Sequence, residues 1–310
     1  MAGSKRAIPP KRLFKYRSFN TFTLRMLTEA ELFYAAPFNF NDPMDCNPTL
    51  TIDISSRQML VLLKTMLIPN VGIEKTRDTI ARNKKQASFF ADEGIGASEY
   101  FSRIFGGDIL TELKSELGSI GVLSLSAVWD SPAMWSYYAD EHRGLCIEYD
   151  TTDHTHRQIG KVSYSAPRAI NLSDVYAWKV KGDLNALELI KQTYYYAKSS
   201  QWSHEREWRD LRSRYGAYDT LLPISAIHFG MRRDKSVKTS IVKLLYRQLS
   251  IKLYEVSPKD TGFNLRRDLV DRDKINESGI TEPLYIMARR FSQLYGNDWT
   301  AGNGDDFDMA

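Results

Sequence analysis

The distribution of apolar and polar positions along the chain predicts a mixture of short strands and helices. Apolar and polar residues alternate roughly over Leu13–Arg17, and a mainly apolar run covers Leu145–Tyr149, so both segments are expected to be strands. The same reasoning predicts further strands at 33–36, 121–126, 161–164, 224–229 and 251–256. A short helical turn is expected at 28–32, and apolar residues at helical spacing predict longer helices at 184–199 and 235–249.

The order of these elements favours an α+β fold. Strands and helices do not alternate regularly, as they would in a doubly wound parallel sheet. Residues 55–117 are expected to be helical, with an apolar stripe between Met59 and Leu67, and we interpret them as a helical insert. The predicted organisation is a basic mobile arm over 1–12, one domain over 13–265, and a C-terminal extension with an acidic tail over 266–310.

A helix in the middle of the chain has clear boundary signals. Ser131 suits the N-cap position and Pro132 the first turn, so a helix carrying Trp135, Tyr137 and Tyr138 should begin there. Gly144 is expected to end it.

Composition narrows the class of protein. Of 310 residues, 43% are hydrophobic and 26% charged, which is ordinary for a globular chain and excludes disordered, collagen-like and disulfide-scaffold classes. The net charge of +4 is too small to favour nucleic-acid binding by default. The two cysteines, Cys46 and Cys146, are expected to be free thiols in a reducing compartment. No apolar segment resembles a signal peptide or a membrane span, so the predicted location is the cytoplasm.

Familiar catalytic signatures are missing from the sequence. It contains no glycine-rich phosphate loop, no zinc-type histidine or cysteine spacing and no nucleophile elbow. The run Asp153-His154-Thr155-His156 offers ligand atoms but has no cysteine near it. We therefore predict no metal site.

Polar side chains stand instead near the ends of three predicted strands. Tyr16 and Arg17 end the first strand. The Arg17 guanidinium is either a surface charge or a group that binds phosphate oxygens through two hydrogen bonds. Ser124 and Ser126 share one face of the middle strand, which is either a solvated face or the lining of a pocket.

The third feature is the run Trp202-Ser203-His204-Glu205-Arg206-Glu207-Trp208-Arg209. If this run is extended, Glu205 and Glu207 point to one side, where one carboxylate raises the pKa of the other. The alternatives are a salt-bridged surface strand or a pair of carboxylates that work as acid and base or stabilise a cation. The two tryptophans favour a partly buried cleft.

The segments LFKYRSF, FNDPMD, SLSAVWDSPAMWSYYADEHRGLCIEYD, WSHEREWR, IHFGMRRD and KLYEV resemble, in this order, the pattern of the bacterial family called domain of unknown function 2971. The resemblance covers about residues 13–257. This family is distantly similar to the ADP-ribosyltransferase superfamily. Its arginine-type members carry an Arg, a Ser-Thr-Ser and a Glu-x-Glu on successive strands of a split sheet, whereas this chain has Leu125 in place of the Thr.

The resemblance implies a role for each matching residue. Arg17 would hold the NAD diphosphate, and Ser124 and Ser126 would support the nicotinamide-side ribose. Glu207 would bind a ribose hydroxyl and stabilise the oxocarbenium-like cation, and Glu205 would face the acceptor. Further candidates are Tyr16 and Tyr137 for stacking on nicotinamide, and His142, Arg143, His204 and Arg209 for substrate contacts.

The predicted function is therefore an NAD-dependent ADP-ribosyltransferase that modifies a protein or a nucleic acid, in a toxin or phage-defence setting, with NAD as substrate and no metal. One alternative is a non-catalytic module on the same fold that senses a nucleotide or a phage component. Another is a metal-dependent nuclease whose ligands are Glu205, Glu207 and Asp140.

Overall fold

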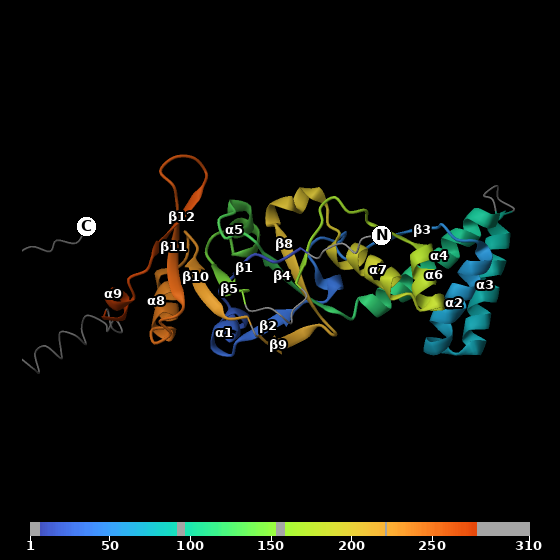
Figure 1. Cartoon of the computed structure of the whole chain (residues 1–310), viewed down its shortest axis with the longest axis horizontal. Coiled ribbons are helices and arrows are strands. Elements are labelled where there is room, and N and C mark those ends of the chain that lie inside the picture. The colour runs from blue at the N-terminus through green and yellow to red at the C-terminus, as the bar shows by residue number, and fades with distance from the viewer. Residues whose placement is uncertain (1–6, 92–96, 153–158, 221, 278–310) are drawn as a thin grey trace, which may run out of the picture.

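A mixed eight-stranded sheet forms the centre of the computed structural model, which describes residues 7–91, 97–152, 159–220 and 222–277 (Figure 1). All its neighbouring strands are antiparallel except the parallel pair β10–β11. In spatial order the strands are β12 (Leu265–Leu269), β11 (Lys252–Pro258), β10 (Ile224–Phe229), β5 (Leu145–Asp150), β1 (Arg12–Arg17), β4 (Gly121–Ser126), β8 (Glu207–Arg212) and β6 (Gly160–Lys161).

Two small sheets accompany the large one. They pair β2 (Glu31–Tyr34) with β9 (Gly216–Asp219), and β3 (Thr49–Thr51) with β7 (Ala169–Asn171). Short helices lie between the strands: α1 (Thr21–Thr28), α5 (Pro132–Tyr138), α8 (Lys235–Leu244), and the 3-10 helices η1 (Pro37–Asn39) and η2 (Ser200–Glu205). Helix α9 (Arg272–Glu277) follows the last strand, β12. The α+β class predicted from the sequence is confirmed.

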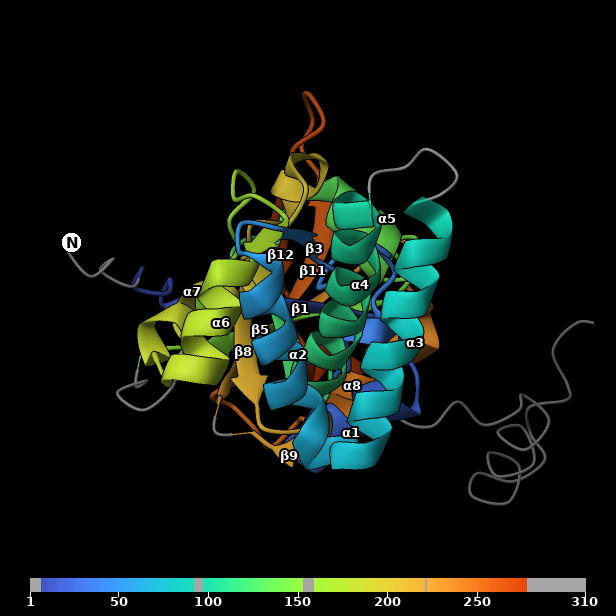
Figure 2. The same cartoon turned by 90° about the vertical axis from the view of Figure 1, so that its right-hand side faces the viewer.

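The other helices gather at one end of the sheet, opposite the end that carries α8 and α9 (Figures 1 and 2). They are α2 (Ser56–Val71), α3 (Ile73–Ala91), α4 (Ala97–Leu117), α6 (Leu172–Lys181) and α7 (Leu184–Tyr196). Helix α2 begins with a reciprocal capping box between Ser55 and Gln58, which satisfies two backbone donors of the first turn.

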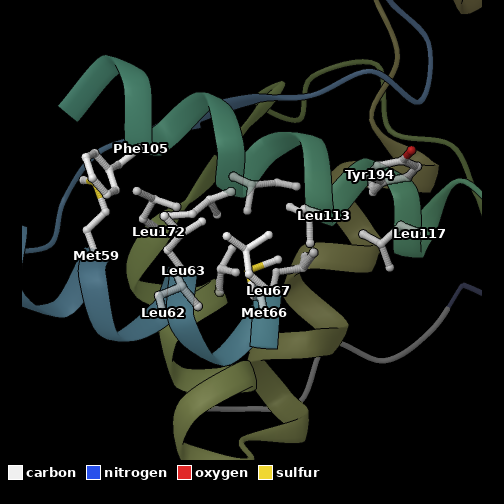
Figure 3. Packing of buried hydrophobic residues seen from close by; sticks show 14 of the residues in the cluster. Met59, Leu62, Leu63, Met66, Leu67, Phe105, Leu113, Leu117, Leu172 and Tyr194 are labelled. Atoms are coloured by element: carbon white, nitrogen blue, oxygen red, sulfur yellow. The ribbon is translucent and has the colours of Figure 1, made fainter. Parts of the chain in front are cut away.

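The helical end has a core of its own. Side chains from α2 face those of α4, with Leu172 of α6 and Tyr194 of α7 closing the cluster (Figure 3). Met59, Leu63 and Phe105 have no exposed surface, so the apolar stripe seen in the sequence is the buried face of α2. No helix within the described ranges is long and apolar enough to cross a membrane.

Several predicted boundaries are wrong. The expected turn at 28–32 is the end of α1 followed by strand β2, in which buried Leu32 and Tyr34 alternate with exposed Phe33. Strand β12 pairs with β11, so residues 266–269 belong to the main sheet and not to a C-terminal extension. Residues 278–310 lie outside the described part. Helices α7 and α8 end at Tyr196 and Leu244, earlier than expected.

Gly144 does not end helix α5. The helix stops at Tyr138, and Asp140, Glu141 and His142 then adopt left-handed backbone conformations. Gly144 follows this turn, where a Cβ would collide with the carbonyl oxygen of Arg17. The glycine therefore allows the turn to approach the end of β1.

Trp135 anchors α5 to the sheet. It has no exposed surface, its Nε1 donates to the Trp129 carbonyl oxygen at 2.7 Å, and its ring meets that of Tyr16 edge-on at 5.3 Å. We expect Trp135→Ala to lower the free energy of unfolding by about 3–5 kcal/mol, because it leaves a large cavity. Phe263 is 95% exposed, so Phe263→Ala is a control expected to change stability by less than about 0.5 kcal/mol. Equal denaturation midpoints for the two variants would contradict this role.

Candidate active site

Strands β1 and β4 diverge next to their single registered pair, Phe14 with Ser126. In contrast, β1 pairs with β5, and β4 with β8, along their whole lengths. A cleft of about 430 Å³ is lined from both diverging strands, a volume typical of small-molecule sites. Its lining includes seven residues singled out from the sequence: Tyr16, Arg17, Ser124, Ser126, Tyr137, Glu205 and Glu207.

The two glutamates belong to a buried ionic network. Lys198 Nζ lies 2.5 Å from Glu205 Oε2, 2.9 Å from Glu207 Oε2 and 3.3 Å from Asp45 Oδ2. Arg209 binds Glu207 Oε1 through Nε at 2.7 Å and Asp45 Oδ2 through a terminal nitrogen at 2.6 Å. Three carboxylates thus face two cations, which leaves the network one net negative charge when all five groups are ionised.

The two glutamates have pKa values shifted in opposite directions in this network. Burial alone would raise the pKa of Glu207, but Arg209 and Lys198 outweigh it and hold that pKa well below the ordinary value. Burial raises the pKa of Glu205, against the opposing effect of Lys198. Glu207 is therefore the firmly ionised member of the pair, and Glu205 takes up a proton more readily.

The backbone between the glutamates is not extended, contrary to the sequence prediction. Glu205 ends η2, Arg206 is left-handed with φ 45°, and Glu207 begins β8. Both carboxylates nevertheless reach Lys198, so the two glutamates lie together although the backbone turns at Arg206.

The serines hold the glutamates in place. A hydrogen bond from Ser124 helps to lower the pKa of Glu207. The Ser126 hydroxyl donates to the Glu205 carbonyl oxygen at 2.7 Å and accepts from the Val128 amide at 3.1 Å. Their shared strand face was predicted, and both side chains border the cleft.

Arg17 enters the cleft with hydrogen-bonding capacity to spare. Its Nε is buried and has no hydrogen-bond partner among the described residues. Burial lowers the pKa of this guanidinium. A buried cation with an unused donor favours an anionic ligand.

The two predicted stacking residues differ in exposure. Tyr16 is buried, and its hydroxyl donates to the Val128 carbonyl oxygen at 2.9 Å, so it forms part of the cleft wall. Tyr137 is 66% exposed, and its ring centroid lies 6.2 Å from those of Trp202 and His204. Of the two, Tyr137 is free to stack on a ligand.

Four predicted substrate contacts do not line the cleft. Arg209 has no exposed surface, so its predicted contact with substrate is wrong, and it supports Asp45 and Glu207 from behind. His142 lies 3.3 Å from the Ser136 hydroxyl and stacks on Trp135. Arg143 is exposed and pairs with Glu141 at 2.8 Å. His204 stands beside the cleft residue Tyr137.

Three charged residues of the cleft lining escaped the sequence reasoning: Asp45, Lys198 and Lys15. Asp45 follows the Asn-Asp-Pro turn of a loop, and Lys198 follows α7. Neither residue belongs to a helix or strand whose apolar periodicity could have pointed to it. Lys15 shares a strand face with Arg17 in the alternation of β1, and its amine reaches the neighbouring strand at the Ser124 carbonyl oxygen.

A metal centre finds no support in the described ranges. No group of three His, Cys, Asp or Glu side chains within them could hold a metal ion. Asp140 is exposed and is not among the residues that line the cleft with Glu205 and Glu207, so the described structure does not gather the three expected nuclease ligands there. The run from Asp153 to His156 lies outside the described residues. Cys46 and Cys146 are buried and free.

Comparison with known proteins identifies one family. Residues 134–209 match the family described as "Protein of unknown function (DUF2971)", in agreement with the resemblance inferred from the sequence motifs. The matched segment contains most of α5, all of η2 and both glutamates of the cleft. No curated protein and no solved structure matches the chain.

Proposed function

We propose that the cleft binds NAD and transfers ADP-ribose to a protein or a nucleic acid. The observation that carries this proposal is the convergence of Arg17, Ser124 and Glu207 on one cleft from three neighbouring strands. These residues are far apart in sequence, and they are the ones that the ADP-ribosyltransferase resemblance selects. The divergence of β1 from β4 supports an ADP-ribosyltransferase-like split sheet.

Charge in the cleft suits this reaction. Cleavage of the bond between ribose and nicotinamide builds positive charge on the ribose, and a fixed carboxylate aimed at that charge stabilises the transition state. Glu207 is ionised and immobilised by Arg209 and Lys198, and the network that includes it carries one net negative charge when all five groups are ionised. Arg17 supplies the unused donor for the diphosphate.

The remaining cleft residues would orient the substrate. Tyr137 would stack on a flat ring at the cleft, and Ser124 would lie beside the ribose that Glu207 contacts. Glu205 would face the acceptor, held by the Tyr138 hydroxyl at 2.6 Å and by Lys198. Holding both reactants in one geometry converts transfer into an effectively unimolecular step.

One observation favours a second candidate, a non-catalytic module that binds a nucleotide. Both carboxylate oxygens of Glu207 already bind cations, which weakens the field that the carboxylate can offer to a ribosyl cation. Such a module would use Arg17 and Tyr137 and would bind NAD without consuming it.

Incubation with radiolabelled NAD and a total cell lysate tests the function. We expect nicotinamide release together with label in a protein or nucleic-acid fraction, unchanged by EDTA. Binding of NAD without nicotinamide release would support the binding module. If the protein neither binds NAD nor releases nicotinamide, both candidates are overturned. Activity abolished by EDTA and restored by a divalent cation would revive the nuclease class.

A further inference from the structure

Lys15 lines the cleft, and the proposed function assigns it no role. It follows Phe14, the single position where β1 registers with β4. Its Nζ donates to the Ser124 carbonyl oxygen at 2.6 Å, across the gap where the two strands separate. Lys15 is therefore half-buried where β1 and β4 separate, and it lines the cleft together with Arg17 and Glu207.

Charged groups from several elements face this amine. Arg17 comes from β1, Glu207 and Arg209 from β8, and Glu205 from η2. Burial and Arg17 lower the pKa of Lys15 to about 7, although the two glutamates oppose this shift. Above that pH most of the population is a neutral amine, and below it most is an ammonium ion.

Other titratable groups of the cleft are less able to accept a proton. Both oxygens of Glu205 are engaged, one by Tyr138 and the other by Lys198. Glu207 is held as an anion by Arg209 and Lys198, with its pKa far below neutrality. Neutral Lys15 uses one N–H for the Ser124 carbonyl oxygen and keeps its lone pair.

We propose that Lys15 is the proton acceptor of the transfer step, an inference that rests on the proposed function. The acceptor is then a nucleophile that carries its proton at neutral pH: a hydroxyl, a guanidinium or a ring or amide N–H. The bond between ribose C1′ and nicotinamide breaks, and its electron pair leaves with neutral nicotinamide. The acceptor atom forms the new bond to C1′, and its proton moves to Lys15, which becomes an ammonium ion.

Two variants and one control test this role. Lys15→Arg keeps a cation that cannot deprotonate near neutral pH, and Lys15→Met removes the amine. Lys64, exposed on α2, provides the control Lys64→Met. In wild type, label transfer to lysate should rise with pH through about 7. Both Lys15 variants should lose this rise and transfer about 10²-fold more slowly, while nicotinamide release to water falls less.

A second measurement is independent of NAD. Competitive acetylation with acetic anhydride across pH, read by mass spectrometry, should titrate Lys15 with a midpoint near 7, about three pH units below the ordinary lysine value of about 10.4. A Lys15 midpoint at the ordinary lysine value would overturn the inference. The inference is also overturned if the wild type cleaves NAD and the Lys15→Arg variant transfers label at the wild-type rate and with the wild-type pH dependence. A wild type that cleaves no NAD overturns the proposed function itself, and with it the role of Lys15.

Discussion

Replacing Glu207 by Gln should lower nicotinamide release by about 10²–10³-fold, the range found for one preorganised stabilising group. Gln keeps the shape of the side chain and can still accept from Arg209, but it lacks the charge that would stabilise a ribosyl cation. The measurement is nicotinamide release from NAD, with thermal unfolding of the same sample to show that the variant is folded. Release at the wild-type rate would contradict the role of Glu207.

The neighbouring glutamate provides the matched comparison. Glu205→Gln removes a carboxylate of the same network, two residues away and held by the same Lys198. We expect label transfer to fall in this variant while slow NAD hydrolysis persists, because water needs less positioning than a large acceptor. If the two variants lose release and transfer in the same proportion, the glutamates do not have separate roles.

The candidate site was more predictable from the sequence than its supports. Arg17, Ser124 and Ser126 could be found because they stand on short predicted strands, and Glu207 because it forms a Glu-x-Glu pair between two tryptophans. Their convergence depends on strand order, which places β1, β4 and β8 side by side although β4 follows β1 by about a hundred residues. Only the resemblance, and not the periodicity, pointed to that convergence.

The supporting residues gave no such signal. Asp45 belongs to an irregular loop, and its contact with Arg209 spans 164 positions of the chain. Arg209 itself stands in a charged run that is typical of a solvated strand, yet it is fully buried. A buried charge is stable only when its partners arrive from elsewhere in the fold, and a single sequence does not reveal those partners.

Lys15 illustrates a third kind of failure. Strand alternation puts it on the face opposite Phe14 and Tyr16, and therefore opposite Ser126, which registers with Phe14. Strands β1 and β4 share no other registered pair, and the Lys15 amine reaches across to donate to the Ser124 carbonyl oxygen. Local patterns predict a face of a sheet, whereas a gap in the sheet is a tertiary feature.

Arg209→Met should be the most destabilising of the variants considered for the cleft. It leaves Asp45 and Glu207, both at most 4% exposed as side chains, without their common guanidinium, so the free energy of unfolding should fall by about 3–5 kcal/mol. The loss of Arg209 also raises the pKa of Glu207, because this cation is the largest influence that lowers it. Carboxylates with raised pKa take up protons more easily, so the deficit relative to wild type should be smaller at pH 5 than at pH 7.

The control for this variant is another arginine with two carboxylate partners. Arg25 pairs with Glu29 at 3.3 Å and Glu31 at 2.6 Å, but its side chain is 44% exposed. Arg25→Met should cost no more than about 1 kcal/mol, because solvent screens such pairs, and its deficit should not shrink at low pH to the same extent. Urea unfolding of both variants at the two pH values measures the difference. Equal losses of unfolding free energy in the two variants would mean that the buried Arg209 stabilises the protein no more than the exposed Arg25, and would contradict its role in holding Glu207 in place.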